Sequence, residues 1–500
     1  MSQPQKRNEP RKRTGSMPAG RDIRRRKQSA ARRVREEEPQ TQRTAQVQQR
    51  TEQLKQKTAQ AKQRTAKQKT TKTKQTKHTR APKQRAKIAL PDRRTLFSIL
   101  GALLLIAAIV LLVVGIKSCG NKENKEGRDS AVVSSLDNSS LVTGKPAKAT
   151  ILSSGDYLIH KEIFTNISTG NGTWDFDSIF TNVKDEISAA DYSICNFEFT
   201  ITEGTNYNFY PHFKLPPASA DALKNAGFDF LITANNHSGD DREEGIYRTV
   251  KILRDKGFKT TGTKEKPDEK SYAVVNVKGI KIGIVNYTFG TIDDQGLKAL
   301  NGNAALDANA SQCINVFQNE KLDQLYTELD QITKTMKKDG AEAYIAYMHW
   351  GNEFQLTQST VQEEIAQKLC DLGYAAVIGG HPHVIQPAAV LKDANGNKTF
   401  CLYSMGNMVS NQRREYFPSS RGYTEDAIFV YTTFERDNDG NVKLTKVDYT
   451  PVWMNKYSSG GRYAYRLEAC KGENLSSSQQ ASKDRTDGLV KAGFDAFETQ

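Results

Sequence analysis

Short apolar runs alternate with amphipathic segments along residues 147–399. The runs have the length of buried strands, and they are Ala149–Leu152, Tyr192–Cys195, Phe228–Ile232, Ile280–Val285, Ala343–Met348 and Ala375–Ile378. Between the runs, apolar residues recur at helical spacing, as in Ile246, Val250 and Leu253, in Leu322, Leu325, Tyr326, Leu329 and Ile332, and in Val361, Ile365, Leu369 and Leu372. Glycines stand where these helices would end, at positions 227, 257, 340 and 373. This rhythm predicts a layered α/β domain.

After Thr399 the helical spacing stops, and the remaining apolar runs predict strands alone. These runs are Phe400–Tyr403, Ala427–Phe434, Val442–Val447 and Val452–Met454, and the residues 437–441 between two of them form a plausible hairpin turn. The α/β domain is therefore expected to cover residues 147–456. Residues 457–500 form a C-terminal extension in which we find no functional pattern.

A membrane span is predicted at residues 95–117. Its centre, Leu96–Ile116, has 21 residues without a charge, which matches a helix crossing a hydrocarbon core of ~30 Å. The segment is too long, and too far from the N-terminus, for a cleaved signal peptide. Basic residues before it place the N-terminus in the cytoplasm and the C-terminal domain outside the cell. Residues 118–146 are polar and read as a linker.

Charge is divided unevenly along the chain. Residues 1–94 hold 30 Lys and Arg against 7 Asp and Glu, whereas the remainder holds 42 against 50. The first part has few large apolar residues, so we expect a disordered cytoplasmic tail. It is either a contact for the anionic inner leaflet or cytoplasmic partners, nucleic acid included, or a topology determinant and spacer. No specific nucleic-acid partner is expected, because the outer domain is acidic.

Metal-capable side chains follow five of the predicted strands. Asp156 and Glu198 come after the first two strands, and His237 follows the third with Asn236 before it; His349 follows another strand, and His381 and His383 follow the last. Ends of neighbouring strands meet at one sheet edge. Imidazole, carboxylate and amide groups suit Zn, Mn or Fe. The pattern predicts a divalent metal site there, whereas a lone histidine would more often be structural.

The same residues allow a two-metal centre. Two metals about 3.5–4 Å apart need a bridging carboxylate, which Glu198 or Asp156 offers, and together they would activate a water. His237 would serve as general acid for the leaving group, oriented by Asp240. The alternative role for Asp240 is to cap the following helix.

Six motifs occur in an order typical of a known family. They are Gly155-Asp156, Asn196-Phe197-Glu198, Ala234-Asn235-Asn236-His237 with Asp240, His349-Trp350-Gly351-x-Glu353, Gly380-His381-Pro382-His383-Val384-Ile385-Gln386-Pro387 and Tyr403-Ser404-Met405-Gly406-Asn407. Over residues 147–455 the chain resembles the bacterial CapA, or poly-γ-glutamate synthesis, family, which is similar to calcineurin-like metallophosphoesterases.

The resemblance implies a four-layer α/β/β/α domain with a two-metal site at the sheet edge. It implies metal ligation by six residues, Asp156, Glu198, Asn236, His349, His381 and His383, and a catalytic role for His237. Family members are membrane-attached proteins that take part in making, anchoring or exporting polyglutamate capsule. The expected partners are the membrane, capsule synthase membrane components and an anionic envelope polymer.

The chain departs from the wider superfamily at two positions. The superfamily has an Asp-x-His motif, whereas in this chain the histidine, His160, lies four residues after Asp156. His160 is therefore either a metal ligand or, as we favour, a neighbour of the site. Glu198 stands where a bridging Asp is usual, which leaves hydrolysis open. His212, Lys214 and Arg421 are further candidates for shaping the pocket or holding an anion, although loop packing and solvated charge are their commoner roles.

Three functions therefore compete. One is a metal-dependent hydrolase or transferase that acts on a phosphorylated or amide-linked envelope polymer. Another is a non-catalytic capsule-assembly or polymer-binding component; the chain contains no Gly-x4-Gly-Lys-Ser/Thr phosphate loop, so ATP-driven ligation must reside elsewhere. In the third and weakest hypothesis, the basic tail is a nucleic-acid or lipid tether.

The sequence also leaves open a Cys313–Cys470 disulfide.

Overall fold

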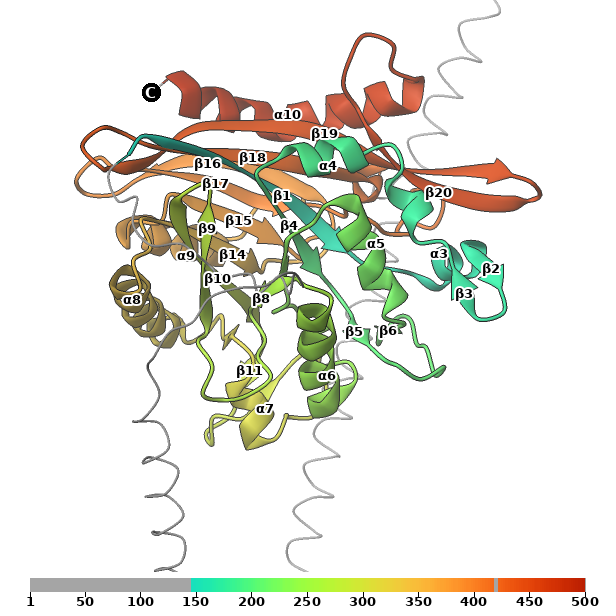
Figure 1. Ribbon diagram of the computed structural model, residues 1–500, viewed down its shortest axis with the longest axis horizontal. Helices are drawn as coiled ribbons and strands as arrows, with labels where there is room; N and C mark the ends of the chain where they lie inside the picture. The colour runs from blue at the N-terminus through green and yellow to red at the C-terminus, as the bar shows by residue number, and fades with distance from the viewer. Residues whose placement is uncertain (1–144, 418–420, 500) are drawn as a thin grey trace, which may run out of the picture. The chain divides into compact units, whose positions relative to one another are not determined.

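Two seven-stranded sheets form the centre of the protein in a computed structural model that describes residues 145–417 and 421–499 (Figure 1). In the first sheet, the strands on one side of β1 are joined by parallel pairing. On the other side, every neighbouring pair is antiparallel. Its order is β20 (Arg462–Ala469), β19 (Val442–Ser459), β18 (Asp426–Arg436), β1 (Ala147–Tyr157), β4 (Tyr192–Phe197), β7 (Phe230–Ile232) and β8 (Lys259–Thr261).

The second sheet has a parallel centre with antiparallel strands at its sides. Strands β10, β14, β15 and β17 run parallel, while β9 and β16 pair antiparallel with β10 and β17. The order is β13 (Val316–Phe317), β10 (Ile280–Phe289), β14 (Ala343–His349), β15 (Ala376–Gly380), β17 (Lys398–Met405) and β16 (Ile385–Lys392), with β9 (Tyr272–Val277) on β10.

Alternating residues of the central strands enter different cores. In β1, Ile151 points into the core between the two sheets and Leu152 into the core under the outer helices. In β14, Ile345 faces the inter-sheet core and Ala346 the opposite outer core. Strands that are buried on both faces read as continuous apolar runs, which explains why the sequence shows no polar alternation there.

Helices cover the outer face of each sheet (Figure 1). The first sheet is covered by α3 (Lys161–Asn166), η1 (Asp177–Phe180), α4 (Lys184–Ala189), α5 (Ala218–Ala226) and α6 (Arg242–Asp255). The second sheet is covered by α8 (Leu322–Lys338) and α9 (Thr360–Asp371). The predicted α/β class is confirmed, and the layers follow the order helix, sheet, sheet, helix.

Loops and small two-stranded sheets complete the domain, and β5 pairs with β6 in parallel. The pairs are β2 (Ser168–Gly170) with β3 (Thr173–Trp174), β5 (Thr200–Ile201) with β6 (Lys214–Leu215), and β11 (Thr291–Ile292) with β12 (Lys298–Ala299). Two further short helices are α7 (Ala308–Gln312) and η3 (Tyr423–Glu425). All four glycines predicted to end helices have positive φ, as a left-handed helix end requires.

The C-terminal residues differ from the prediction. The boundary expected at residue 456 falls inside β19, and Ser477–Thr499 form a long helix, α10. Val490 and Phe494 of α10 enter the inter-sheet core, where Phe494 contacts the rings of Phe400 and Tyr449. The buried stripe of α10 includes Ser482, Thr486 and Gly493. A stripe of such small and polar residues leaves almost no hydrophobic pattern to detect in the sequence.

The predicted tail, span and linker, at residues 1–94, 95–117 and 118–146, lie outside the described residues except for the last two of the linker. Within residues 145–417 and 421–499, no helix is both long enough and apolar enough to cross a bilayer. Cys313 and Cys470 are both buried free thiols, so the disulfide that the sequence left open is not formed.

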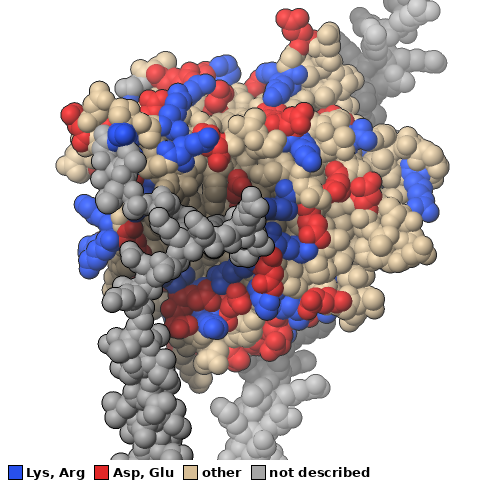
Figure 2. All heavy atoms as spheres, viewed as in Figure 1, with Lys and Arg blue, Asp and Glu red and all other residues tan. Residues whose placement is uncertain are grey.

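Charges of both signs are interspersed on the domain face that Figure 2 shows.

Arg485 on α10 donates two hydrogen bonds to the buried Asp426 carboxylate of β18, at 2.6 and 2.7 Å. Because that carboxylate is 1% exposed, its pairing with Arg485 offsets the cost of burying its charge. Helix α10 is thus fixed to the first sheet by an ion pair as well as by apolar contacts.

Two glycines of α10 offer a matched test of its docking. A Cβ at Gly493 would lie 2.1 Å from the Ala388 carbonyl oxygen of β16, whereas a Cβ at Gly488 would meet no atom within 4 Å. We expect Gly493→Ala to lower the free energy of unfolding by about 1–3 kcal/mol, because the helix must move away from the sheet. Gly488→Ala should raise it by up to about 1 kcal/mol through helix propensity. Denaturant unfolding followed by tryptophan fluorescence measures both, and equal effects would contradict the docking.

Candidate functional site

The carboxyl ends of the parallel strands in both sheets meet at one edge, where the pairing of β1 with β4 is irregular. The β1–β4 register shifts between Ser154 and Asp156, as at a β-bulge. A Cβ at Gly155 would lie 2.0 Å from the Gly406 carbonyl oxygen. Gly155 therefore allows β1 to approach residue 406, to which the Asp156 N–H donates at 3.0 Å. This contact sets the position of the Asp156 carboxylate.

Asn196 holds both site carboxylates. Its Nδ2 donates to Asp156 Oδ1 at 2.7 Å and to Glu198 Oε2 at 3.2 Å. The Asn196 Oδ1 in turn accepts from Asn235 Nδ2 at 3.2 Å. Asp156 and Glu198 are fully buried, so these amides supply the hydrogen bonds that water would otherwise make.

His349, Asn236 and Glu198 converge from three different strand ends. His349 Nε2 lies 2.8 Å from Asn236 Oδ1 and 3.6 Å from Glu198 Oε1. Glu198 Oε1 is buried and has no hydrogen-bond partner. Ligands of one transition metal are separated by roughly 3–3.5 Å when each bond is about 2.1 Å, so this spacing fits a shared ion.

His381 and His383 come from the turn after β15 and complete the cluster. Both have positive φ, 92° and 56°, a strained conformation for non-glycine residues that is common at functional sites. His383 Nδ1 lies 3.1 Å from Asp156 Oδ2 and 3.0 Å from Asn407 Oδ1. These acceptors place its hydrogen on Nδ1 and leave Nε2, 3.9 Å from Glu198 Oε1, available as a ligand.

The electrostatics of the cluster favour a bound cation. Burial raises the pKa of the Glu198 carboxyl well above its ordinary range, and the charge of Asp156 raises it further. Burial and the neighbouring imidazoles lower the pKa of His349 and His381 well below the ordinary value, which keeps the rings neutral. Burial also lowers the pKa of His383, but the hydrogen bond and charge of Asp156 outweigh this and the pKa is raised.

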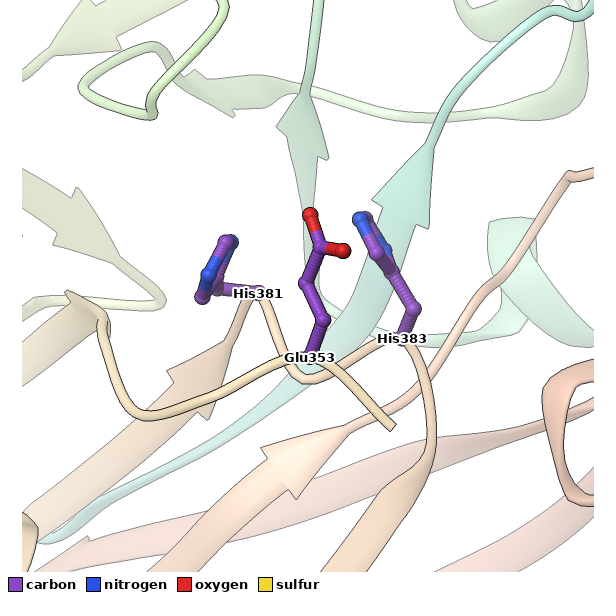
Figure 3. Close-up of side chains that lie close together, drawn as sticks. All are labelled: Glu353, His381 and His383. Carbon is purple, nitrogen blue, oxygen red and sulfur yellow. The ribbon is translucent and has the colours of Figure 1, made fainter. Parts of the chain in front are cut away.

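Two groups of side chains are arranged as metal ligands. Asp156, Glu198 and His349 form a buried group, and Glu353, His381 and His383 form a second one; within each group the ligand atoms lie within 4.8 Å of one another. Figure 3 shows the Glu353 side chain between the two imidazole rings. His381 Nδ1, like Glu198 Oε1, is buried without a hydrogen-bond partner. The donors present therefore fit divalent cations.

His237 lies beside these groups and is held by Asp240. Its Nδ1 is 2.7 Å from Asp240 Oδ2, which also accepts the Phe213 N–H at 2.6 Å. The α6 helix begins at Arg242 with Asp241 at the cap position, so Asp240 is not the cap that the sequence left as an alternative. Since Asp240 engages Nδ1, Nε2 of His237 is the atom left for proton transfer.

A cleft of about 440 Å³ opens on this site, with His237, Glu353 and His383 among its lining residues. His160 lines the cleft, but it belongs to neither ligand group; its Nδ1 accepts from the Asn411 N–H at 3.2 Å. Its favoured role as a neighbour of the site agrees with this position.

The remaining candidates lie apart from the cleft lining. His212 faces Asp240, with its Nδ1 3.6 Å from Oδ1 of the carboxylate. Lys214 pairs with Asp241 at 3.0 Å, so it is not placed to hold an anion in the cleft. Arg421 has a positive φ of 52° and is likewise not a lining residue.

Three contributors to the site had no assigned role in the sequence. Asn196 donates hydrogen bonds to the two carboxylates, and Asn407 contacts His383. Glu353 joins the second ligand group. Each lies in a quoted motif, and Asn196 and Asn407 stand at strand ends as the predicted ligands do. That position was the available signal, but an amide there is indistinguishable from an ordinary turn residue.

The fold and site define an α/β protein of two packed sheets with a carboxylate–imidazole cluster at their common edge. Residues 150–412 match the family described as bacterial capsule synthesis protein PGA_cap. This match covers more than half of the chain, so the chain belongs to that family. The family predicted from the motif series is confirmed.

Two relatives extend the comparison. The chain is 27% identical over 271 residues to the capsule biosynthesis protein CapA of Bacillus anthracis, which covers 53% of this chain and 60% of the relative. It is 25% identical over 291 residues to the PGA biosynthesis protein CapA of Bacillus subtilis (strain 168), covering 56% and 68%. The matched region thus spans less than two thirds of the B. anthracis protein.

The half-buried His160 predicts a pH dependence of stability. Burial, followed by the charge of His383, lowers its pKa to about 3, so the folded chain resists a proton that the unfolded chain accepts below about pH 6.5. His160 therefore favours folding above that pH, and this contribution is lost as the pH falls from 6.5 toward 3. Between pH 7.5 and 5 the loss should be roughly 1–2 kcal/mol.

Denaturant unfolding of wild type and His160→Asn at both pH values measures this contribution. Asn retains an acceptor for the Asn411 N–H but does not titrate, so the variant should lose less stability on acidification. His212→Asn, at a side chain that is 40% exposed, is the control. An unchanged pH dependence in His160→Asn would show that folding does not lower the pKa of His160.

Proposed function

We propose that this protein is a membrane-anchored, outward-facing component of capsule or poly-γ-glutamate biosynthesis or export that works through a two-metal, hydrolase-like site. Family membership and the printed names of its two relatives support the capsule role. The apolar segment at residues 95–117 supports the anchor. An anionic envelope polymer and the membrane components of its synthase would be its partners.

The metal site rests above all on Glu198. Its Oε1 is buried, lacks a hydrogen bond, and lies between Nε2 of His349 and Nε2 of His383 at 3.6 and 3.9 Å. A carboxylate so placed is unfavourable without a cation and well placed to be shared by two. Asp156, Asn236, His349, His381 and His383 are the other proposed ligands, and Glu353 is added to them. Mn, Zn or Fe suits this donor set.

When bound, the ions would supply Lewis acidity and a nucleophilic water for attack on phosphorus or a carbonyl carbon. The chain itself supplies the proton transfer. His237, positioned by Asp240 through Nδ1, would donate the proton on Nε2 to the leaving group. The aromatic side of the cleft would exclude water from part of the substrate.

One observation favours a non-catalytic assembly or polymer-binding role instead. His160 Nδ1 is engaged by a backbone N–H, and His160 stands outside both ligand groups. The cluster thus lacks the second ligand of the usual Asp-x-His motif, and Glu353 is the only described addition to the ligand groups beyond the predicted set. A site of this kind could bind a metal without turning over a substrate.

Metal content separates these possibilities. Purified full-length protein should carry about two transition-metal ions per chain and hydrolyse a phosphodiester, and His381→Ala/His383→Ala should lose both metal and activity. Lys148→Ala/Glu435→Ala, which removes an exposed ion pair at the far end of β1 from Asp156, is the control. Metal retained by the double variant would refute the ligand assignment, and metal without activity would support the assembly role.

A second variant tests His237 as the proton donor. We expect His237→Gln to lower turnover of an alkyl phosphodiester by about 10²–10⁴-fold, because an alkoxide leaves poorly without a proton. A p-nitrophenyl ester, which leaves without one, should be affected far less while metal content stays at the wild-type level. An equal loss on both substrates would assign His237 to binding or structure.

A further inference from the structure

A cavity of about 790 Å³ opens at one side of the domain, between an edge strand of each sheet. Strand β8 is the last strand of the first sheet, and β9 pairs only with β10 in the second. The two strands contact each other (Figure 1), and residues of both line the cavity. Tyr192, Lys259 and Lys281 place it at the amino ends of β4, β8 and β10. The cavity is therefore separate from the candidate metal site, which lies at the carboxyl ends.

The edge of β9 carries backbone groups that have no strand partner. Lys281 of β10 directs its N–H and its C=O toward Glu342, whose carboxylate and N–H bind them at 2.9 and 2.8 Å. Asn276 is the register partner of Lys281, and Val274 follows the same alternation. When one member of an antiparallel pair points its backbone groups away, the other member does so too. Val274 and Asn276 thus present N–H and C=O groups at an open edge, which can accept another strand.

The floor of the cavity is apolar. Tyr192, Ala273 and Val275 line it, and they belong to the inter-sheet core or pack against it. The cavity is therefore an opening in the side of that core. Apolar side chains that fill the opening would extend the core and be removed from water.

The rim of the cavity carries positive charge that no acidic group of the described residues offsets. Lys259 and Lys281 line the cavity, and neither forms an ion pair within residues 145–417 and 421–499. The other two charged lining residues, Arg254 and Asp339, are each bound to partners of opposite charge. An occupant that brings both apolar side chains and a carboxylate therefore fits this lining.

The described chain begins beside this cavity. Arg436 donates to the Gly279 carbonyl in the β9–β10 turn at 2.6 Å and to the Lys145 carbonyl at 3.4 Å. Residues 133–144 directly precede Lys145, and an extended segment of that length reaches up to about 40 Å. The segment contains four large apolar residues, and its single charged residue is Asp137. It thus has both kinds of side chain that the lining requires.

We propose that residues 133–144 dock into this cavity and add a strand to the free edge of β9. In this arrangement Leu141 and Val142 cover the apolar floor, and Asp137 pairs with Lys259 or Lys281. Because the segment belongs to the same chain, its effective concentration at the cavity is roughly millimolar, which favours it over a partner in solution. Residues 118–132 are then the remaining connection between the predicted span and the domain. The inference goes beyond the proposed function and does not depend on the metals.

Disulfide cross-linking of the full-length protein in detergent tests the docking. All variants carry Cys119→Ser, because the five cysteines of the described residues are buried. Val142→Cys/Asn276→Cys should form an intramolecular disulfide under mild oxidation, which mass spectrometry of the digested monomer identifies. Val142→Cys/Tyr463→Cys is the control, since Tyr463 is 53% exposed on β20, at the opposite edge of the first sheet from β8. The cross-linked fraction should be at least about tenfold lower in the control.

Equal fractions in the two pairs would overturn the inference. A disulfide that joins two chains through position 276 would overturn it as well, and would assign the edge of β9 to a second copy of the protein.

Hydrogen exchange separates docking from mere proximity. Leu141→Asp/Val142→Asp should expose the outward amides of β9 and speed their exchange about tenfold or more, as measured by mass spectrometry of peptides that cover residues 272–277. Ser139→Asp/Ser140→Asp adds the same charge to the segment without removing apolar side chains, so exchange should stay close to wild type. Exchange that is equally fast in wild type and in both variants would show that no strand covers β9.

Charge reversal tests the contact of Asp137. In the Val142→Cys/Asn276→Cys chain, Lys259→Glu/Lys281→Glu should lower the cross-linked fraction several-fold, because the rim then repels Asp137. Adding Asp137→Lys should restore the fraction. An unchanged fraction in the double Glu variant, or a loss that Asp137→Lys does not restore, would overturn the proposed pairing.

Discussion

Burial of two carboxylates at the one edge where both sheets end is the constraint on which the site depends. Asp156 and Glu198 are buried away from water. Asn196 donates a hydrogen bond to each carboxylate, His349 lies beside Glu198, and His383 lies beside Asp156. One oxygen of Glu198 is still left without a partner. Keeping both carboxylates charged here is unfavourable unless a cation is bound, and the raised pKa of Glu198 is the corresponding response of the site without one.

The sheets can bring these groups together because their backbones approach unusually closely. Gly155 of β1 lies against the carbonyl of Gly406, which follows β17 of the second sheet. Away from the site, α10 closes the sandwich by contributing to the inter-sheet core and by pairing with β18 through Arg485. The site is therefore carried by a rigid frame, in which strand ends rather than long loops set the ligand positions.

The cleft divides recognition from chemistry. Its inner end holds histidines and carboxylates, whose requirements are a metal and a proton donor. Its mouth holds exposed aromatic rings, which supply neither a metal ligand nor a proton to such chemistry.

The sequence determined the elements and the chemistry of the site, because both are local. Runs such as Ala343–Met348 were recognisable as strands, and His349 directly after one was recognisable as a sheet-edge group. The motif series was sufficient for the family. Tertiary structure alone decided that Glu353 joins His381 and His383 and that His160 accepts a hydrogen bond from Asn411. It also decided that the polar segment 477–499 forms a helix that packs on the core. Those outcomes depend on how close two backbones can come and on the packing of residues far apart in the chain, which no local pattern records.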